Sequence, residues 1–451
     1  MSLATRARGT RRRRLHPAWL VAMVAFLALL GAAGFRAAPG ALMVPLHEEF
    51  GWSTSVMSLA VSINLLLYGL TAPFAAALMD RFGVRQVVAT ALTLVALGAG
   101  GSVLMTTSWQ LVVCWGVLIG LGTGSMALVL AATIATRWFH RRRGLVMGIL
   151  TAGSATGQLI FLPVVAHLSA TAGWRPASLV VAGAALLVVP VVLVVVRDHP
   201  EDRGARPYGA DESYVPAPRA GGGATRRALE GLTFASRHRS FWALAAAFAI
   251  CGATTNGLVG IHFIPSAHDH GMPTTTAAGL LAVVGVFDIV GTVASGWLTD
   301  KYDPRILLAL YYFFRGVGLA QLPALLAATV HPSMVLFIVI YGLDWVATVP
   351  PTVALCREAF GDRGTIVFGW VFASHQVGAA IAALGAGVIR DTFGSYTYAW
   401  WGGGALCVVA ALLSSGARPF RRDPVAGDRR TKGVAGQDPA SVPAARRAAT
   451  R

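Results

Sequence analysis

Twelve apolar stretches constrain the fold of this chain more than any other feature. Each has about 20 residues, enough for a helix to cross the ~30 Å hydrocarbon core of a membrane. Hydrophobic residues make up 55% of the chain and charged residues 13%, whereas about a quarter of residues are charged in soluble proteins. The sequence therefore predicts an all-α polytopic membrane protein with 12 transmembrane helices, and it excludes a disordered chain. The stretches begin near Ala18, Ser53, Gln86, Trp109, Gly144, Pro176, Phe241, Thr274, Ile306, Ser333, Thr365 and Tyr396.

The net charge of +17 lies mainly outside these stretches. Residues 1–16 and 417–451 carry +6 each, and residues 197–239 carry +2. With both termini on the inner side, the tails, the central segment and the inner loops hold 33 of the 37 basic residues. Because basic loops stay in the cytoplasm, we expect both termini to be cytoplasmic and the protein to span the inner cell membrane. The basic tails then indicate topology and contact with membrane lipid, and no nucleic-acid partner.

A polar central segment divides the chain into two halves. We expect a basic cytoplasmic tail at 1–17, an N-terminal six-helix half at 18–196 and a C-terminal six-helix half at 240–416. Residues 197–239 are rich in Gly, Pro, Arg and acids, so they are predicted to form a flexible cytoplasmic linker. Residues 417–451 are predicted to be a disordered basic tail.

An internal repeat supports this division. The second span is followed by DRFGVR at residues 80–85, and the eighth by DKYDPR at residues 300–305, 220 residues later. At the same offset, an Arg-Gly pair precedes both the fifth and the eleventh spans, at 143–144 and 363–364. Two matches in equivalent loops predict two pseudo-repeat halves around a central substrate site.

These loops resemble the signature of the major facilitator superfamily, G-x-x-x-D-[RK]-x-G-x-[RK], between its second and third helices. The resemblance implies a major facilitator fold in which the loop latches helices and holds an outward-open state. Ala76 replaces the leading glycine of the first copy, and Asp303 replaces the later glycine of the second. The matching gating residues are Asp80, Arg81, Gly83 and Arg85 in the first copy, and Gly296, Asp300, Lys301 and Arg305 in the second.

A narrower resemblance concerns the fifth span, where WFHRRRGLVMGILTAGSATG at residues 138–157 is similar to a signature of the monocarboxylate transporters. The resemblance implies a bacterial branch of that family. It also implies that Asp288 matches an acid of the eighth helix that handles protons. Thr292 stands where the animal members place an arginine, and the family's first-helix lysine is absent. Bacterial relatives include a lipopeptide exporter, so the direction of transport is left open.

Ionisable side chains inside the spans are functional candidates, because burying each costs at least ~2.5 kcal/mol. Arg36, with Asn256, His375 and Gln376, is predicted to bind an anionic substrate. The alternatives are that Arg36 extends to the outer interface and that His375 only packs between helices. Asp288 is predicted to exchange a proton during the cycle, with a structural hydrogen-bonded acid as the alternative.

Arg315 and Asp344 lie at matching depths in neighbouring antiparallel spans. We expect a buried structural ion pair between them. If Arg315 pairs elsewhere, Asp344 becomes a second proton-coupling candidate. The adjacent Pro350-Pro351 pair indicates a bend in the same span.

Together these features predict a secondary active transporter that moves a small, monocarboxylate-like organic anion with protons by alternating access. We expect a monomer with a small-molecule substrate and no cofactor or metal, because the four cysteines lack metal-ligand spacing and there is no phosphate-binding loop. An enzyme would need a clustered nucleophile or metal set, which the sequence lacks. The alternatives are efflux of an amphipathic compound, such as a drug or a lipopeptide, and a non-transporting membrane sensor.

Overall fold

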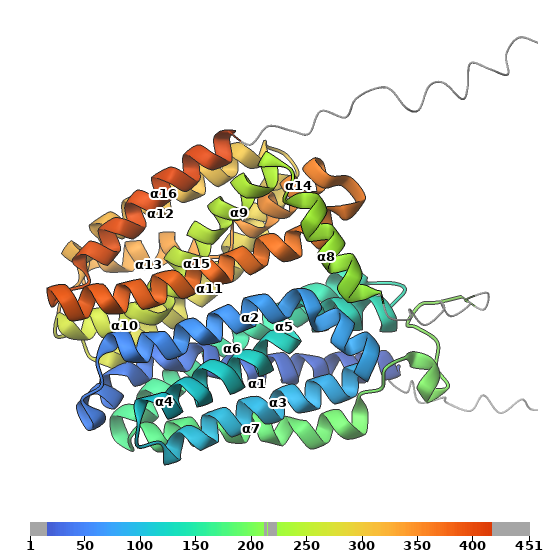
Figure 1. Ribbon diagram of the computed structural model, residues 1–451, viewed down its shortest axis with the longest axis horizontal. Coiled ribbons are helices and arrows are strands. Elements are labelled where there is room, and N and C mark those ends of the chain that lie inside the picture. The colour runs from blue at the N-terminus through green and yellow to red at the C-terminus, as the bar shows by residue number, and fades with distance from the viewer. Residues whose placement is uncertain (1–15, 212–213, 215–222, 417–451) are drawn as a thin grey trace, which may run out of the picture.

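The computed structural model of the protein describes residues 16–211, 214 and 223–416 (Figure 1). In that part of the chain, 12 helical spans are long and apolar enough to cross a membrane, so the predicted all-α architecture is confirmed. The expected disordered tail at 417–451 and nearly all of the expected tail at 1–17 lie outside the described residues.

The first six spans form the N-terminal half. The fourth span changes from α-helix to π-helix at Val112–Ile119 and back again. The bounds are α1 (Pro17–Phe50), α2 (Thr54–Phe82), α3 (Val84–Gly101) with a 3₁₀ turn at Ser102–Leu104, α4 (Ser108–Leu111) continuing into α5 (Gly120–Trp138), α6 (Arg143–Thr171) and α7 (Trp174–Val195).

The last six spans form the C-terminal half, in which two spans are interrupted. The seventh span contains a π-helix at Ala253–Val259, and the tenth is broken between its two helices. The bounds are α9 (Arg239–Gly252) continuing into α10 (Gly260–Asp269), α11 (Thr274–Thr299), α12 (Pro304–Leu325), α13 (Pro332–Asp344) followed by α14 (Val349–Phe360), α15 (Gly364–Phe393) and α16 (Thr397–Gly416).

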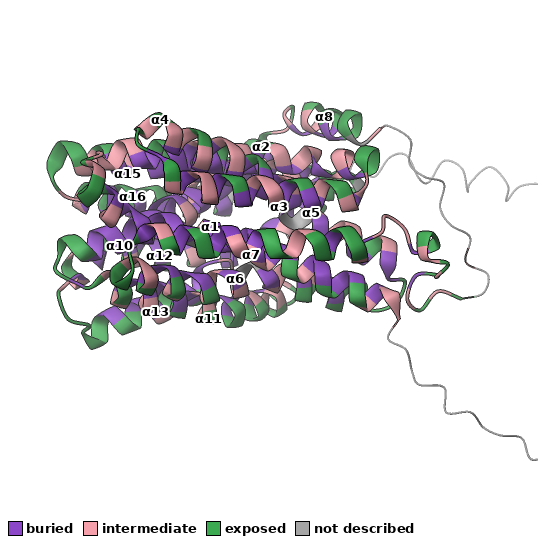
Figure 2. Cartoon of the chain, turned by 90° about the horizontal axis from the view of Figure 1, so that it is seen from below, coloured by how far each residue is buried: buried purple, intermediate pink, exposed green. Residues whose placement is uncertain are grey.

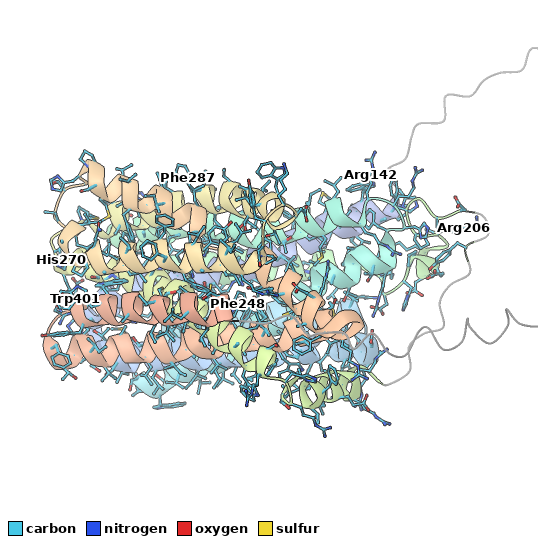
Figure 3. The ribbon with its side chains drawn as sticks, turned by 90° about the horizontal axis from the view of Figure 1, so that it is seen from above. Arg142, Arg206, Phe248, His270, Phe287 and Trp401 are labelled. Carbon is cyan, nitrogen blue, oxygen red and sulfur yellow. The ribbon has the colours of Figure 1, made fainter. Side chains whose placement is uncertain are left out.

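The two ends of the bundle differ. One end, called here the linker end, carries the central segment, and Figure 3 places Arg142 and Arg206 there. The other, the short-loop end, carries tight connections such as residues 51–53 and 394–396, with His270 and Trp401 nearby (Figure 3). Tight connections are possible because glycines end the helices there: Gly51 ends α1 with φ +67 and bonds back to the carbonyl of His47.

Apolar residues cover both the inside and the outside of the bundle. Figure 2 shows buried residues along the helices and exposed ones on their outer faces as well as at the ends. Several of the exposed residues are large and aliphatic, such as Leu187, Val194 and Val293, which are 74%, 69% and 70% exposed. An apolar outer surface of this kind suits helices that are surrounded by lipid.

The two halves meet along paired spans. Helix α2 packs along α15, α6 packs along α11, and α1 touches α10. The contact between α2 and α15 is close, because a Cβ atom on Gly69 would lie 2.5 Å from Cβ of Gln376. Small residues at such positions let helix backbones approach within a membrane.

The central segment was expected to be a flexible linker, but its described residues are packed against both halves. The backbone nitrogen of Tyr208 donates to the carbonyl of Trp138, 2.8 Å away, and the Tyr208 ring packs against Trp19 and Phe139. Helix α8 (Ala224–Ala235) then lies against α2 and α15 at the linker end (Figure 1). Composition suggested a solvated chain, whereas aromatic and backbone contacts hold these parts in place.

Candidate functional site

A cavity of about 520 Å³ lies between the two halves. Phe248, which Figure 3 places midway along the bundle, is part of its wall. Residues of the first, second, fourth, fifth, seventh, eighth, tenth and eleventh spans contribute to the lining. The charged and amide-bearing side chains in it, together with its histidine, are Arg36, Asn64, Gln158, Asn256, Asp288, His375 and Gln376.

The cavity is closed toward the short-loop end. A Cβ atom on Gly40 of α1 would lie 2.9 Å from the carbonyl oxygen of Ile261 in α10, so the two helices touch there. The carboxylate of Asp391 accepts hydrogen bonds from the backbone nitrogens of Thr54 and Ser55, at 3.1 and 2.7 Å. A side chain of α15 thus caps the first turn of α2, and this contact joins the two halves.

Toward the linker end the halves are less closely joined. In the described part of the chain, α5 and α14 make no contact comparable to that of α1 with α10. The cavity wall also reaches Gly148 and Phe368, which lie close to the linker ends of α6 and α15. The cavity therefore extends toward the linker end and is blocked at the other.

Arg36 lies in the cavity wall and does not extend to the short-loop end of α1. Its Nη1 donates to the hydroxyl of Tyr68 on α2, 2.9 Å away, and the guanidinium carbon lies 5.4 Å from the centre of the same ring. One aromatic residue thus fixes the cation by a hydrogen bond and a cation–π contact. The remaining guanidinium donors are available to an anion, since Arg binds carboxylates through several donors at once.

His375 and Gln376 lie on the opposite wall, on α15, and both are at least nine-tenths buried. The His375 ring is stacked on Phe372, with 5.9 Å between ring centres and 6° between planes, and lies 4.8 Å from Phe248. Neither Nδ1 of His375 nor Oε1 of Gln376 has a hydrogen-bond partner among the described residues. Buried polar atoms without partners are rare in folded proteins, so these two need a partner from elsewhere.

Asn256 also lines the cavity, from the π-helical part of the seventh span. It lies 220 residues after Arg36, and Asp288 lies 220 residues after Tyr68. The offset of the sequence repeat therefore relates two pairs of cavity residues, one pair in each half. The sequence analysis did not single out Tyr68, although this offset from Asp288 could have identified it.

Asp288 lines the cavity and is bound to the break in the tenth span. Its Oδ1 accepts hydrogen bonds from Oγ1 of Thr292 and from the backbone nitrogen of Val346, both at 3.0 Å. Thr292 thus occupies the position of the expected family arginine and orients the acid. Val346 lies between α13 and α14, where the helix cannot satisfy its own backbone groups.

The other freed backbone groups of this break are also satisfied by side chains. Arg315 donates through Nη2 to the carbonyl of Asp344 at 2.7 Å, and Ser295 donates to the carbonyl of Ala347 at 2.5 Å. A break inside a membrane is tolerated only where such partners replace the helical hydrogen bonds. The Pro350-Pro351 pair lies just after the break, at the start of α14, where proline fits a helix.

Arg315 and Asp344 form a buried salt bridge, with Nε and Oδ2 2.6 Å apart. Nη1 of Arg315 donates to Sγ of Cys251 at 3.0 Å, so the guanidinium joins three spans of the C-terminal half. Asp344 is not among the described residues that line the cavity. This geometry favours the structural role for Asp344 over the alternative of a second proton site.

The first copy of the predicted gating loop joins helices within the N-terminal half. Asp80 at the end of α2 forms a salt bridge with Arg137 of α5, 2.5 Å long. Gly83 has φ +86, a conformation that glycine adopts without strain. The backbone nitrogen of Arg85 donates to Oδ1 of Asp198, 3.2 Å away, which ties the loop to the start of the linker.

The second copy is arranged differently. Arg305 forms a salt bridge with Glu358 of α14, 2.9 Å long, while Asp300 has no salt-bridge partner in the described part of the chain. The residue 220 positions after Arg137 is Arg357, which does not pair with Asp300 as Arg137 pairs with Asp80. Gly296 has open space where a Cβ would be. Arg81 and Lys301 place their cations over the rings of Phe82 and Trp297.

The chain is similar to membrane transporters along most of its length. A family model described as "Major Facilitator Superfamily" matches residues 21–368. A protein of Bacillus subtilis (strain 168) named "Uncharacterized MFS-type transporter YcxA" is 26% identical over 407 residues, covering 88% of this chain and 93% of that protein. "Monocarboxylate transporter 13" of Rattus norvegicus is 28% identical over 398 residues and covers 87% of each chain.

Among solved structures, similarity extends to the fold. The crystal structure of the D-xylose–proton symporter matches with a TM-score of 0.68 at 17% identity, covering 89% of this chain and 98% of that chain. The inward open conformation of the xylose transporter XylE from E. coli matches with a TM-score of 0.64 at 16% identity, covering 89% and 96%. At this level of identity the two likenesses concern the fold alone.

Proposed function

The chain belongs to the major facilitator superfamily, and from this we propose that it carries a small organic anion across the membrane together with protons, by alternating access. That it is a multi-pass secondary transporter and not an enzyme follows from the family itself. The anion, the proton and the orientation are the proposal.

The position of Arg36 carries the proposal. It is the one arginine in the described cavity lining, and Tyr68 holds it there. A buried guanidinium needs an anionic partner to offset its loss of hydration. In the described part of the chain no carboxylate forms a salt bridge with Arg36, so a substrate carboxylate is the partner that fits.

The similarity to transporters whose names include monocarboxylates supports the same class. The support is for a substrate class, since these relatives are 27–28% identical to the chain.

Asp288 is the proton site in this proposal. As a carboxylate it accepts from Val346 inside the break of the tenth span. Protonation neutralises the acid and weakens that hydrogen bond, because an ionised acceptor forms the stronger one. Proton binding in the cavity is thereby coupled to the joint between α13 and α14, and movement of that joint changes the position of α14 at the linker end.

The orientation follows from charge. Basic residues gather in the loops and segments at the linker end, so we place that end in the cytoplasm. The cavity then faces inward in this structure, with α1, α10 and the Asp391 cap closing the outer side. Opening outward requires these contacts to separate while α5 and α14 approach each other.

Ligand-induced stabilisation of the purified protein tests the anion site. Binding to the folded state raises the melting temperature, so a panel of monocarboxylates is expected to stabilise the wild type. The variant Arg36→Gln is expected to lose this response. Arg175→Gln, which removes an arginine paired with Glu49 at the short-loop end, is the matched control and should keep it. An undiminished response in Arg36→Gln would overturn the proposal.

Efflux of an amphipathic compound is the second candidate, favoured by the aromatic part of the cavity wall. Phe248, Phe368, Phe372 and Trp345 all line it. The same panel discriminates the two, because stabilisation by neutral or cationic amphipathic drugs that is independent of Arg36 would favour efflux.

A further inference from the structure

The cavity has two polar regions, and an aromatic surface connects them. Arg36 is bound to Tyr68 on one side. The Tyr68 ring lies 6.2 Å from that of Phe372, and Phe372 is stacked on His375 with 5.9 Å between centres. A ligand that reaches from Arg36 to His375 must therefore pass along aromatic rings.

The far region has unused hydrogen-bonding capacity. Gln376 is 1% exposed and His375 is 8% exposed, and both line the cavity. Oε1 of Gln376 is an acceptor, and Nδ1 of a neutral histidine accepts or donates according to its tautomer. Both atoms lack a partner among the described residues. A hydrogen-bond donor on the ligand would satisfy the glutamine oxygen and place itself beside the histidine nitrogen.

From these contacts we infer that the carried anion is an aromatic carboxylate with a hydrogen-bond donor at the end remote from the carboxylate, as in a hydroxyphenyl-substituted acid. The inference rests on the proposed anion transport and adds a second recognition point to it. The carboxylate binds Arg36, the ring lies against Tyr68 and Phe372, and the distal hydroxyl donates to Gln376.

A simple aliphatic acid satisfies Arg36 alone. It leaves the polar atoms of His375 and Gln376 without partners, and a site built to hydrogen-bond a hydroxyl discriminates against analogues that lack it. The cavity volume of about 520 Å³ is within the range of pockets that hold ring-containing ligands.

Three acids that differ in one group test this in proteoliposomes: 4-hydroxyphenylacetate, phenylacetate and 4-methoxyphenylacetate. The methoxy compound has the same oxygen but cannot donate. We expect 4-hydroxyphenylacetate to have a half-saturation constant about tenfold lower, or lower still, than the other two acids. Equal constants for the three acids would overturn the inference.

Variants separate the second recognition point from the first. Gln376→Leu is expected to bring the three constants within about twofold of one another while phenylacetate is still transported. Thr255→Val is the matched control, since Thr255 also lines the cavity but its hydroxyl already donates to the carbonyl of Cys251 at 2.7 Å. It should keep the hydroxyl preference. A preference retained in Gln376→Leu would contradict the assignment.

The outcomes distinguish the inference from the proposed function. If all three acids are transported through Arg36 without preference, anion transport stands and the second recognition point is wrong. If phenylacetate transport is unchanged in Arg36→Gln, the proposed anion site is itself wrong, and the inference falls with it.

Discussion

The carboxylate of Asp288 accepts a hydrogen bond from the backbone nitrogen of Val346, 3.0 Å away, within the break between α13 and α14. The acid therefore both lines the cavity and stabilises an irregular segment of a neighbouring span. A structural and a proton-coupling role were alternatives for Asp288 in the sequence. In this geometry they are compatible, because the same oxygen that would bind a proton holds the joint.

Replacing Asp288 with Asn tests this dual role. The amide keeps an acceptor oxygen for Val346 and Thr292 but cannot ionise. We expect the variant to fold and to exchange substrate between the two sides, but to lose accumulation driven by a pH gradient. Counterflow measures the exchange and gradient-driven uptake measures the coupling. Full proton-driven accumulation by Asp288→Asn would exclude Asp288 as the proton site.

Removing Arg315 should destabilise the protein strongly. The change to Met leaves Asp344 buried without its cation and frees the carbonyl of Asp344 at the break. Breaking a buried pair from one side costs about 3–5 kcal/mol. Asp344→Asn should cost less, because Arg315 keeps its bond to that carbonyl. Thermal unfolding in detergent measures both, and equal stability of the two variants would contradict this account.

Asp391→Ala should favour the outward-open state. Its carboxylate caps α2 from the other half, so its removal weakens the closed short-loop end. Spin labels on Thr106 and Val330, placed in a background without native cysteines, report the distance between halves. We expect a larger population at long distance.

The control for this measurement is Asp269→Ala, which breaks a salt bridge to Arg390 at the same end but within the C-terminal half. It should leave the distance distribution unchanged. An equal shift in both variants would mean that the Asp391 cap has no specific role in closure.

Gly69→Ala should impair the contact between the halves. The added Cβ would lie 2.5 Å from Cβ of Gln376, and overpacking of this kind costs about 1–3 kcal/mol. We expect a lower melting temperature and slower transport. Gly183→Ala is the control, since no atom lies within 4 Å of a Cβ at that position. Equal effects of the two changes would argue against a tight contact at Gly69.

The spans were predictable because lipid imposes a simple requirement on sequence. Each predicted start lies within two residues of the observed one, as with Ser53 against Thr54 for the second span and Ile306 against Pro304 for the ninth. Hydrocarbon thickness fixes the length of a span, and charged or turn-forming residues mark its ends. The depth of Arg315 and Asp344 also follows from counting along helices, and the two side chains are paired in the structure.

What the sequence did not reveal depends on contacts between distant segments. The bond of Arg36 to Tyr68 and the cap of Asp391 on α2 join residues that no local pattern relates. The break before Val349 was indicated only as a bend at the proline pair, because its partners come from other spans. The packing of Tyr208 was missed since polar composition conceals a single well-placed aromatic residue.

Uptake of radiolabelled phenylacetate into proteoliposomes, with an acidic exterior and the membrane potential clamped, tests the central claim most directly. We predict saturable accumulation above equilibrium that disappears when the pH gradient is collapsed, and a loss of about 100-fold or more in Arg36→Gln, in line with the cost of removing a charged partner. Uptake that reaches only equilibrium, or that is unaffected by Arg36→Gln, would contradict a proton-coupled anion transporter.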